Sequence, residues 1–202
     1  MDVTGIILAG GSSSRLGRDK ASEPVNGRPL LQWVADRLEQ VAAEIVVVRA
    51  AGQRLPSIET RRPLKVSEDI LPGRGPLAGI HNGLQSASHD LSIAVGCDMP
   101  LLCVPLLRHL CELAEGYDVV MPTRGGQPQP LHAVYRRSCV EAIESELRAG
   151  RLKVISFLGA VRVRYVGEDE WARYDGEGLS FFNVNTEDDL KQAAALLLKA
   201  DV

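Results

Sequence analysis

Two charged residues that could act on phosphate groups each follow a short apolar segment, far apart in the 202-residue chain. Lys20 ends the loop that follows apolar residues 5–8, and Asp98 comes just after residues 91–96. A lysine ammonium neutralises phosphate charge, and a lone carboxylate suits Mg²⁺, which keeps waters and substrate phosphates as its other ligands. Open α/β sheets bind ligands at the carboxyl ends of their strands, so we expect Lys20 and Asp98 to flank one pocket.

The segment 5–20 reads GIILAGGSSSRLGRDK, an apolar run too short for a helix, followed by a glycine- and serine-rich loop. Gly10 and Gly11 let backbone N–H groups approach an anion closely, while Arg15 and Lys20 add positive charge. The loop lacks the Gly-Lys-Ser/Thr of a Walker A motif and the spacing of a GxGxxG dinucleotide fingerprint. The alternative interpretation, a surface turn with incidental charges, is disfavoured because the loop directly follows an apolar strand.

Composition excludes several classes of protein. The net charge of -3 is nearly balanced, so a nucleic-acid backbone is not expected as the main partner. The first residues, MDVTGIILAGG, do not combine a basic region with a long apolar segment, and no later stretch is apolar enough to span a bilayer, so we expect a cytoplasmic protein without membrane contact. Its four cysteines lack CxxC spacing, so we expect free, buried thiols rather than a zinc site or a redox pair.

Hydrophobic periodicity predicts alternating strands and helices along the whole chain. We expect one domain over residues 1–202, with an α/β, doubly wound and mostly parallel sheet flanked by helices. The pattern allows the strand that begins at residue 131 to run antiparallel to its neighbours in the sheet. The predicted strands are 5–8, 44–49, 64–67, 91–96, 117–122, 131–135 and an edge strand at 161–166; the predicted helices are 29–41, 75–87, 105–115, 136–149, a short one opening at 151–153, and 187–199, with a surface loop at 168–178.

Several polar residues also admit a purely structural interpretation. Asp69 stands just past a predicted strand, and on the residues alone a helix or turn cap is favoured over a ligand contact. Asp98 could cap the following helix instead of binding a metal. His132 lies in a predicted strand, where a core histidine with satisfied hydrogen bonds is commoner than a catalytic one. Asn185 or Thr186 could cap the last helix.

Four stretches resemble, in order, signature motifs of the molybdenum cofactor guanylyltransferases. Residues 8–20 resemble LAGGxSxRMGxDK, with Leu16 in place of Met. Residues 75–80 read GPLAGI, residues 97–100 read CDMP, and residues 181–186 read FFNVNT, similar to the family's FxNVNTxEDL. A glycine-rich loop alone would be weak evidence, but these four matches span nearly the whole chain.

The resemblance implies a Rossmann-like nucleotidyltransferase fold and a reaction. That reaction is the transfer of GMP from GTP to the terminal phosphate of molybdenum-loaded molybdopterin, with release of pyrophosphate. It implies Mg²⁺ on Asp98 and catalytic roles for Arg15, Lys20 and Asp98. Transient contact with molybdoenzymes or other cofactor-biosynthesis proteins would follow from the product.

The resemblance also implies two sets of binding residues. The nucleotide would contact the first loop, the GPLAGI segment and two carboxylates: Leu8, Ala9, Gly10, Gly11, Lys20, Asp69, Gly75, Pro76, Leu77, Gly79 and Asp98. The acceptor would contact residues later in the chain: His132, Arg151, Lys153, Asn183 and Asn185.

One departure from the family pattern weakens the assignment of guanine as the base. Family members often have an Asn shortly after the second strand, where residues 48–51 read Val-Arg-Ala-Ala. A cytidylyltransferase for the same cofactor therefore stays open, although the Asp19-Lys20 pair favours the guanine enzyme. A sugar-phosphate nucleotidylyltransferase is less favoured because such chains are longer. A non-catalytic nucleotide-binding adaptor would need neither Asp98 nor Lys20. The oligomeric state, the exact acceptor and the enzyme that receives the product are left open.

Overall fold

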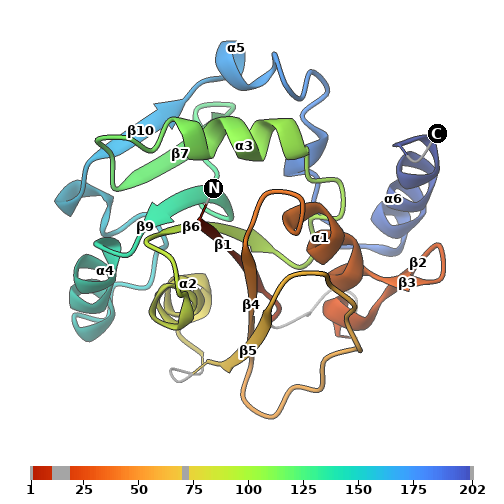
Figure 1. The fold of residues 1–202 in the computed structure, drawn as a ribbon, viewed down its shortest axis with the longest axis horizontal. Helices are drawn as coiled ribbons and strands as arrows, with labels where there is room; N and C mark the ends of the chain where they lie inside the picture. Colours follow the sequence, from red (N-terminus) through yellow and green to blue (C-terminus); the bar gives the residue numbers. More distant parts are fainter. Residues whose placement is uncertain (1, 11–18, 70–72, 201–202) are drawn as a thin grey trace.

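The computed structural model describes residues 2–10, 19–69 and 73–200 and contains an eight-stranded sheet with helices on both faces (Figure 1). The strands are β1 (Val3–Leu8), β4 (Glu44–Arg49), β5 (Leu64–Glu68), β6 (Leu91–Gly96), β7 (Val119–Arg124), β8 (Gln127–Pro128), β9 (His132–Arg136) and β10 (Val163–Val166). The helices are α1 (Leu30–Leu38), α2 (Gly75–Ser86), α3 (Val104–Glu112), α4 (Cys139–Arg148), α5 (Glu168–Trp171) and α6 (Glu187–Ala200).

The main path of the sheet has the strand order β10-β7-β9-β6-β1-β4-β5. Strand β1 pairs in parallel with both β4 and β6, β4 pairs in parallel with β5, and β10 with β7. Strand β9 runs antiparallel to β6 and β7. The prediction of a mostly parallel sheet is therefore confirmed, and so is the prediction of an antiparallel strand beginning near residue 131.

The chain reverses its direction of travel across the sheet at β1. After β1 it proceeds to β4 and β5 on one side and then returns to β6 on the other side. The carboxyl ends of β1 and β6 therefore lie side by side at a topological switch point, where open α/β sheets form a ligand crevice.

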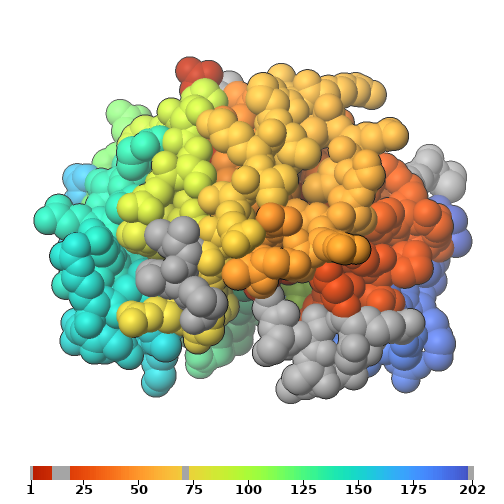
Figure 2. All heavy atoms as spheres, turned by 90° about the horizontal axis from the view of Figure 1, so that it is seen from below, coloured from red at the N-terminus to blue at the C-terminus, as the bar shows by residue number. Residues whose placement is uncertain are grey.

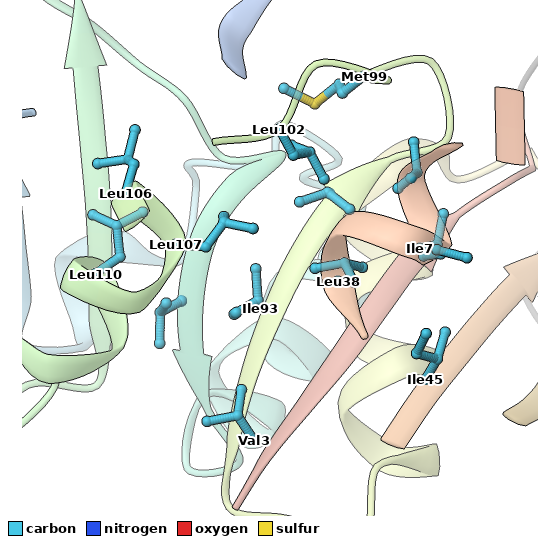
Figure 3. Packing of buried hydrophobic residues seen from close by; sticks show 14 of the residues in the cluster. Val3, Ile7, Leu38, Ile45, Ile93, Met99, Leu102, Leu106, Leu107 and Leu110 are labelled. Atoms are coloured by element: carbon cyan, nitrogen blue, oxygen red, sulfur yellow. The ribbon is translucent and has the colours of Figure 1, made fainter. Parts of the chain in front are cut away.

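The central strands β1, β4 and β6 are buried on both faces, which explains their nearly continuous apolar sequences. Ile7, Ile45 and Ile93 belong to the cluster that packs against α1 and α3 (Figure 3). Their neighbours in sequence, such as Ile6 and Val46, point to the opposite face and pack against α2 and α4. Alternate residues of each strand thus anchor opposite helical layers.

A third apolar cluster lies beside the sheet and attaches the end of the chain. Strands β2 (Pro24–Val25) and β3 (Arg28–Pro29) form a hairpin. Its turn residues Asn26 and Gly27 have φ values of 50° and 76°, the left-handed conformation that asparagine and glycine tolerate best. Helix α6 packs beside this hairpin (Figure 1).

The segment between β4 and β5 is irregular. Figure 2 shows it in orange between α2 in yellow-green and the β2–β3 hairpin in red. Among the described residues no helix is both long and apolar enough to cross a membrane. Cys97, Cys111 and Cys139 are buried and Cys103 is half-buried; all four are free, as predicted.

Two predicted elements are wrong. Residues 151–153 do not open a helix. Helix α4 ends at Arg148, Gly150 follows it with a φ of 73°, and the Arg151 guanidinium turns back to the Glu146 carboxylate. The predicted surface loop 168–178 contains α5 instead. Its Trp171 is buried, because the indole packs on Phe181 and donates a hydrogen bond to the Thr123 carbonyl.

Candidate functional site

A cavity of about 150 Å³ opens at the carboxyl ends of β1, β4 and β6, beside the start of α2. Its lining combines apolar strand ends, glycines and four charged side chains: Leu8, Ala9, Gly10, Lys20, Val48, Arg49, Asp69, Gly75, Pro76, Gly79, Gly96, Cys97, Asp98 and Leu131. Most of the residues predicted to bind a nucleotide therefore lie around one cavity. Arg15 and Gly11 lie outside the described residues, and Leu77 is fully buried in the core under α2.

Lys20 and Asp98 meet at this cavity. The Lys20 ammonium lies 2.9 Å from Asp98 Oδ2 and donates a second hydrogen bond to Asn185 Oδ1 at 2.6 Å. The two charged side chains are 17% and 20% exposed, so a ligand can still reach both. The predicted juxtaposition of Lys20 and Asp98 is confirmed. No pattern in the sequence indicated that Asn185 would contact Lys20.

Lys20 is oriented by the residue before it. Asp19 Oδ1 accepts a hydrogen bond from the Ala21 N–H and caps the short 3₁₀-helix Lys20–Ser22. The same oxygen accepts a hydrogen bond from Gln53 Nε2 at 3.0 Å. Sequence reasoning missed Gln53, because an isolated glutamine in an irregular segment carries no recognisable pattern.

Asp98 is held by its backbone and by the glycine before it. The Asp98 carbonyl accepts the Val184 N–H at 2.8 Å, which ties the end of β6 to the segment that carries Asn185. A Cβ on Gly96 would lie 2.5 Å from Asp98 Oδ1, so only glycine leaves room for the carboxylate there. Cys97 between them is buried, and this burial raises the pKa of its thiol, which favours a packing role.

Asn185 is fixed by the start of α6. The Asp189 carboxylate accepts the backbone N–H groups of Asn185 and Thr186 at 2.9 and 2.8 Å. In return Thr186 Oγ1 accepts the Asp189 N–H at 3.2 Å, so Thr186 caps the helix. Because Thr186 supplies the cap, the side chain of Asn185 is available to Lys20.

The opposite wall of the cavity carries Arg49 and Asp69. The Asp69 N–H donates to the Arg49 carbonyl at 2.8 Å, which places both residues at the ends of β4 and β5. The Arg49 guanidinium donates to Glu68 Oε2 at 2.9 Å and to the Gln53 carbonyl at 2.8 Å. Gly79 brings α2 within van der Waals reach of Leu8 on the cavity floor.

The other residues predicted to bind an acceptor do not line the cavity. His132 is fully buried, its ring lies edge-on to Phe181 at 4.9 Å, and neither ring nitrogen has a hydrogen-bond partner in the described part of the chain. Burial lowers the pKa of His132 to about 4. Asn183 donates to the Phe181 carbonyl, and Arg151 and Lys153 are exposed.

The donor set around Asp98 fits a divalent cation that is shared with a substrate. No cluster of three or more His, Cys, Asp or Glu side chains occurs among the described residues, so this part of the chain offers no all-protein cage. A single carboxylate with one oxygen turned to Lys20 and the other seated against Gly96 suits a cation that takes its remaining ligands from phosphates and water.

Comparison with known proteins relates this site to one family. Residues 5–163 match the model of the MobA-like NTP transferase domain. A protein of Pelotomaculum thermopropionicum named "Probable molybdenum cofactor guanylyltransferase" is 42% identical over 97% of this chain and 94% of its own length. The molybdenum cofactor guanylyltransferase of Desulfosudis oleivorans is 36% identical over 96% of each chain.

Solved structures agree with the sequence comparisons. The crystal structure of molybdopterin-guanine dinucleotide biosynthesis protein A from Archaeoglobus fulgidus has a TM-score of 0.80 and 27% identity, covering 97% of this chain and 99% of that one. The 2-C-methyl-D-erythritol 4-phosphate cytidylyltransferase of Thermus thermophilus shares the fold, with a TM-score of 0.72 at 22% identity over 97% of this chain and 98% of that one. The chain is thus a nucleotidyltransferase by sequence and fold, and it belongs to the MobA-like NTP transferase family.

Proposed function

We propose that the protein transfers GMP from GTP to the terminal phosphate of molybdopterin and releases pyrophosphate. The observation that carries this proposal is the meeting of Lys20, Asp98 and Asn185 at the switch-point cavity. The relatives named molybdenum cofactor guanylyltransferase, which align over nearly the whole chain, support the choice of base and acceptor.

The reaction needs a positioned phosphate rather than a general base. A terminal phosphate oxygen of the acceptor is already anionic near neutral pH and attacks the α-phosphorus of GTP. The new P–O bond forms as the bond between the α-phosphorus and the oxygen bridging to the β-phosphate breaks, and its electron pair leaves on pyrophosphate. Catalysis then consists of aligning the two phosphates and neutralising charge as it develops.

Lys20 is placed to neutralise that charge. Its ammonium is held by Asp98 and Asn185 before any substrate binds, so little reorganisation is needed when phosphates arrive. Arg15 of the first loop is a second candidate for the same task by its place in the motif. Asp98 would hold Mg²⁺, and a bound Mg²⁺ supplies charge neutralisation to phosphate oxygens.

The nucleobase would occupy the part of the cavity that Arg49 and Asp69 line. Gly75 and Pro76 at the start of α2 line the same space, which matches the GPLAGI segment of the family. An arginine and a carboxylate can meet both the acceptor and the donor edge of guanine, and they can also meet those of cytosine. The cytidylyltransferase alternative is therefore decided by experiment.

The acceptor would approach from the side of Asn185. Asn185 lies just before α6, in a part of the chain that follows the residues matched by the family model. Asn183 lies close to it in sequence and donates to its own chain. The roles of His132, Arg151 and Lys153 in acceptor binding remain predictions from the family motifs.

The test measures pyrophosphate release with GTP or CTP, with and without molybdopterin, at fixed Mg²⁺. We expect release that requires both GTP and molybdopterin, with a product whose mass corresponds to the guanine dinucleotide. Release with CTP but not with GTP would overturn the assignment of the base. Nucleotide binding without turnover on any acceptor would support the adaptor alternative and overturn the proposed reaction.

A further inference from the structure

We infer that Gln53 is a positioning residue that fixes Lys20 at the catalytic site. Gln53 lies in the irregular segment after β4 and contacts two other segments of the chain. Its side chain does not line the cavity. The inference rests on the proposed function for its kinetic readout, and a second readout below is independent of that function.

The polar groups of Gln53 are all engaged. Nε2 donates to the Ala9 carbonyl at 3.1 Å and to Asp19 Oδ1 at 3.0 Å, while Oε1 accepts the Ala50 N–H at 2.9 Å. The backbone of Gln53 is fixed as well, because its N–H donates to the Ala50 carbonyl and its carbonyl accepts from Arg49 Nη1. One half-buried side chain thus joins the ends of β1 and β4 to Asp19.

The contact with Asp19 reaches Lys20 in two steps. Gln53 holds the Asp19 carboxylate in the orientation that caps the 3₁₀-helix Lys20–Ser22. That short helix sets the direction in which the Lys20 side chain leaves the backbone, toward Asp98 and Asn185. Because donors must be placed before the transition state forms, a small error in this orientation is costly to the rate.

The amide is the right group for this task, and a carboxylate is not. An amide donates to two oxygens and accepts from an N–H at the same time, which matches the three partners of Gln53. In Gln53→Glu the group still accepts from Ala50, but it faces the Asp19 carboxylate and the Ala9 carbonyl without a proton to donate. Repulsion between the two carboxylates would then displace Asp19.

Gln32 offers a matched control on helix α1. Its Nε2 donates to Asp36 Oδ1 at 2.6 Å and to the Glu59 carbonyl at 2.8 Å, and its Oε1 accepts the Glu59 N–H at 2.8 Å. It therefore pins the same irregular segment with the same kinds of partner. None of its partners lines the cavity. Gln32→Glu imposes the same chemical change away from the site.

The kinetic experiment compares Gln53→Glu, Gln53→Met and Gln32→Glu with wild type. We expect both Gln53 variants to lower kcat by about 10- to 100-fold with little change in KM for GTP, since orientation rather than binding is lost. Thermal melting gives the accompanying loss of stability. A kcat loss in Gln32→Glu equal to that in Gln53→Glu would reduce Gln53 to a general structural tie and overturn the inference.

A chemical experiment reads the position of Lys20 without turnover. Acetyl-N-hydroxysuccinimide modifies free lysine amines, and mass spectrometry compares the rate at Lys20 with that at exposed Lys191, the internal standard. We expect faster acetylation of Lys20 in Gln53→Glu than in wild type or Gln32→Glu, because the ammonium is released from Asp98. An unchanged rate at Lys20 would overturn the inference. If wild type transfers no nucleotide, the proposed function fails while this measurement still decides the role of Gln53.

Discussion

At the scale of single residues, the proposed function gives the ion pair between Lys20 and Asp98 a larger part in the reaction than in the stability of the fold. Both side chains retain access to solvent, so the pair contributes modestly to folding. Its value lies in placement, because it joins a cation from one loop to a carboxylate from another. Lys20 contacts Oδ2 of this carboxylate, and in the proposed function Asp98 would also hold the cation that arrives with the phosphates.

We predict that Lys20→Met and Asp98→Asn each lower kcat/KM by on the order of 100-fold or more, because each removes charge that the transition state needs. The measurement is initial-rate pyrophosphate release at saturating Mg²⁺. Lys191→Met is the matched control, since Lys191 pairs with Asp188 at the same 2.9 Å on the exposed face of α6. Near-wild-type activity in the Lys20 or Asp98 variant would contradict the assignment.

His132 gives a prediction about stability and pH. Burial lowers its pKa from 6.5 to about 4, so the folded state keeps the ring neutral while the unfolded state takes up a proton. His132 therefore leaves the free energy of unfolding unchanged above pH 6.5 and lowers it by about 3 kcal/mol as the pH decreases toward 4. Denaturant titrations across this range should show a shallower decline in His132→Leu than in wild type. His89→Leu, at a partly exposed histidine, is the control, and equal slopes in His132→Leu and wild type would refute the account.

At the scale of elements, close packing of α2 on β1 determines the shape of the cavity. A Cβ added at Gly83 would lie 2.5 Å from Ile6 Cγ2, so only glycine permits this approach. Gly79, one turn earlier, lies against Leu8 in the same way. Gly75 and Pro76 at the start of α2 line the cavity, so a change in the distance between α2 and β1 would also change the shape of the cavity.

We predict that Gly83→Ala lowers the free energy of unfolding by about 1–3 kcal/mol through overpacking, despite a gain in helix propensity of up to about 1 kcal/mol. The shift of α2 should also raise KM for GTP. Gln85→Ala on the exposed side of the same helix should change neither quantity appreciably. A more stable Gly83→Ala variant would show that Ile6 yields without moving the helix.

At the scale of the whole molecule, the site is completed by a segment that follows the last strand of the sheet. Asn185 reaches Lys20 because α6 is fastened to α1 and the β2–β3 hairpin by an apolar cluster. The chain therefore closes on itself: its final helix supports a residue that contacts the loop after its first strand.

We predict that Leu197→Ala destabilises the protein by about 2–5 kcal/mol and lowers activity before the sheet unfolds, because α6 and Asn185 loosen together. Leu197 is fully buried in the third cluster, whereas its neighbour Leu198 is 64% exposed. Leu198→Ala should therefore stay within about 0.5 kcal/mol of wild type. Activity measured over a temperature series, together with thermal melting, tests both variants. Equal effects at the two leucines would contradict the role of the cluster.

Local pattern was enough to predict most of the elements. The segment 44–49 is apolar on both faces and forms β4 over the same residues, since a continuous run of β-branched residues favours a strand buried on both faces. The glycine at 150 ends a helix by its left-handed conformation, again a local effect. Pattern failed at 151–153, where a side-chain contact back to Glu146 replaces the expected helix.

The sequence by itself determined the kinds of chemistry available: a glycine-rich loop ending in Lys20, and a carboxylate, Asp98, just past an apolar strand. Only the tertiary structure decided that Asn185 contacts Lys20 and that Gln53 contacts Asp19, the residue before Lys20. The physical reason is separation along the chain. A strand or cap is stabilised by neighbours within a few residues, whereas a hydrogen bond such as that from Lys20 to Asn185 exists only once the sheet and α6 have packed.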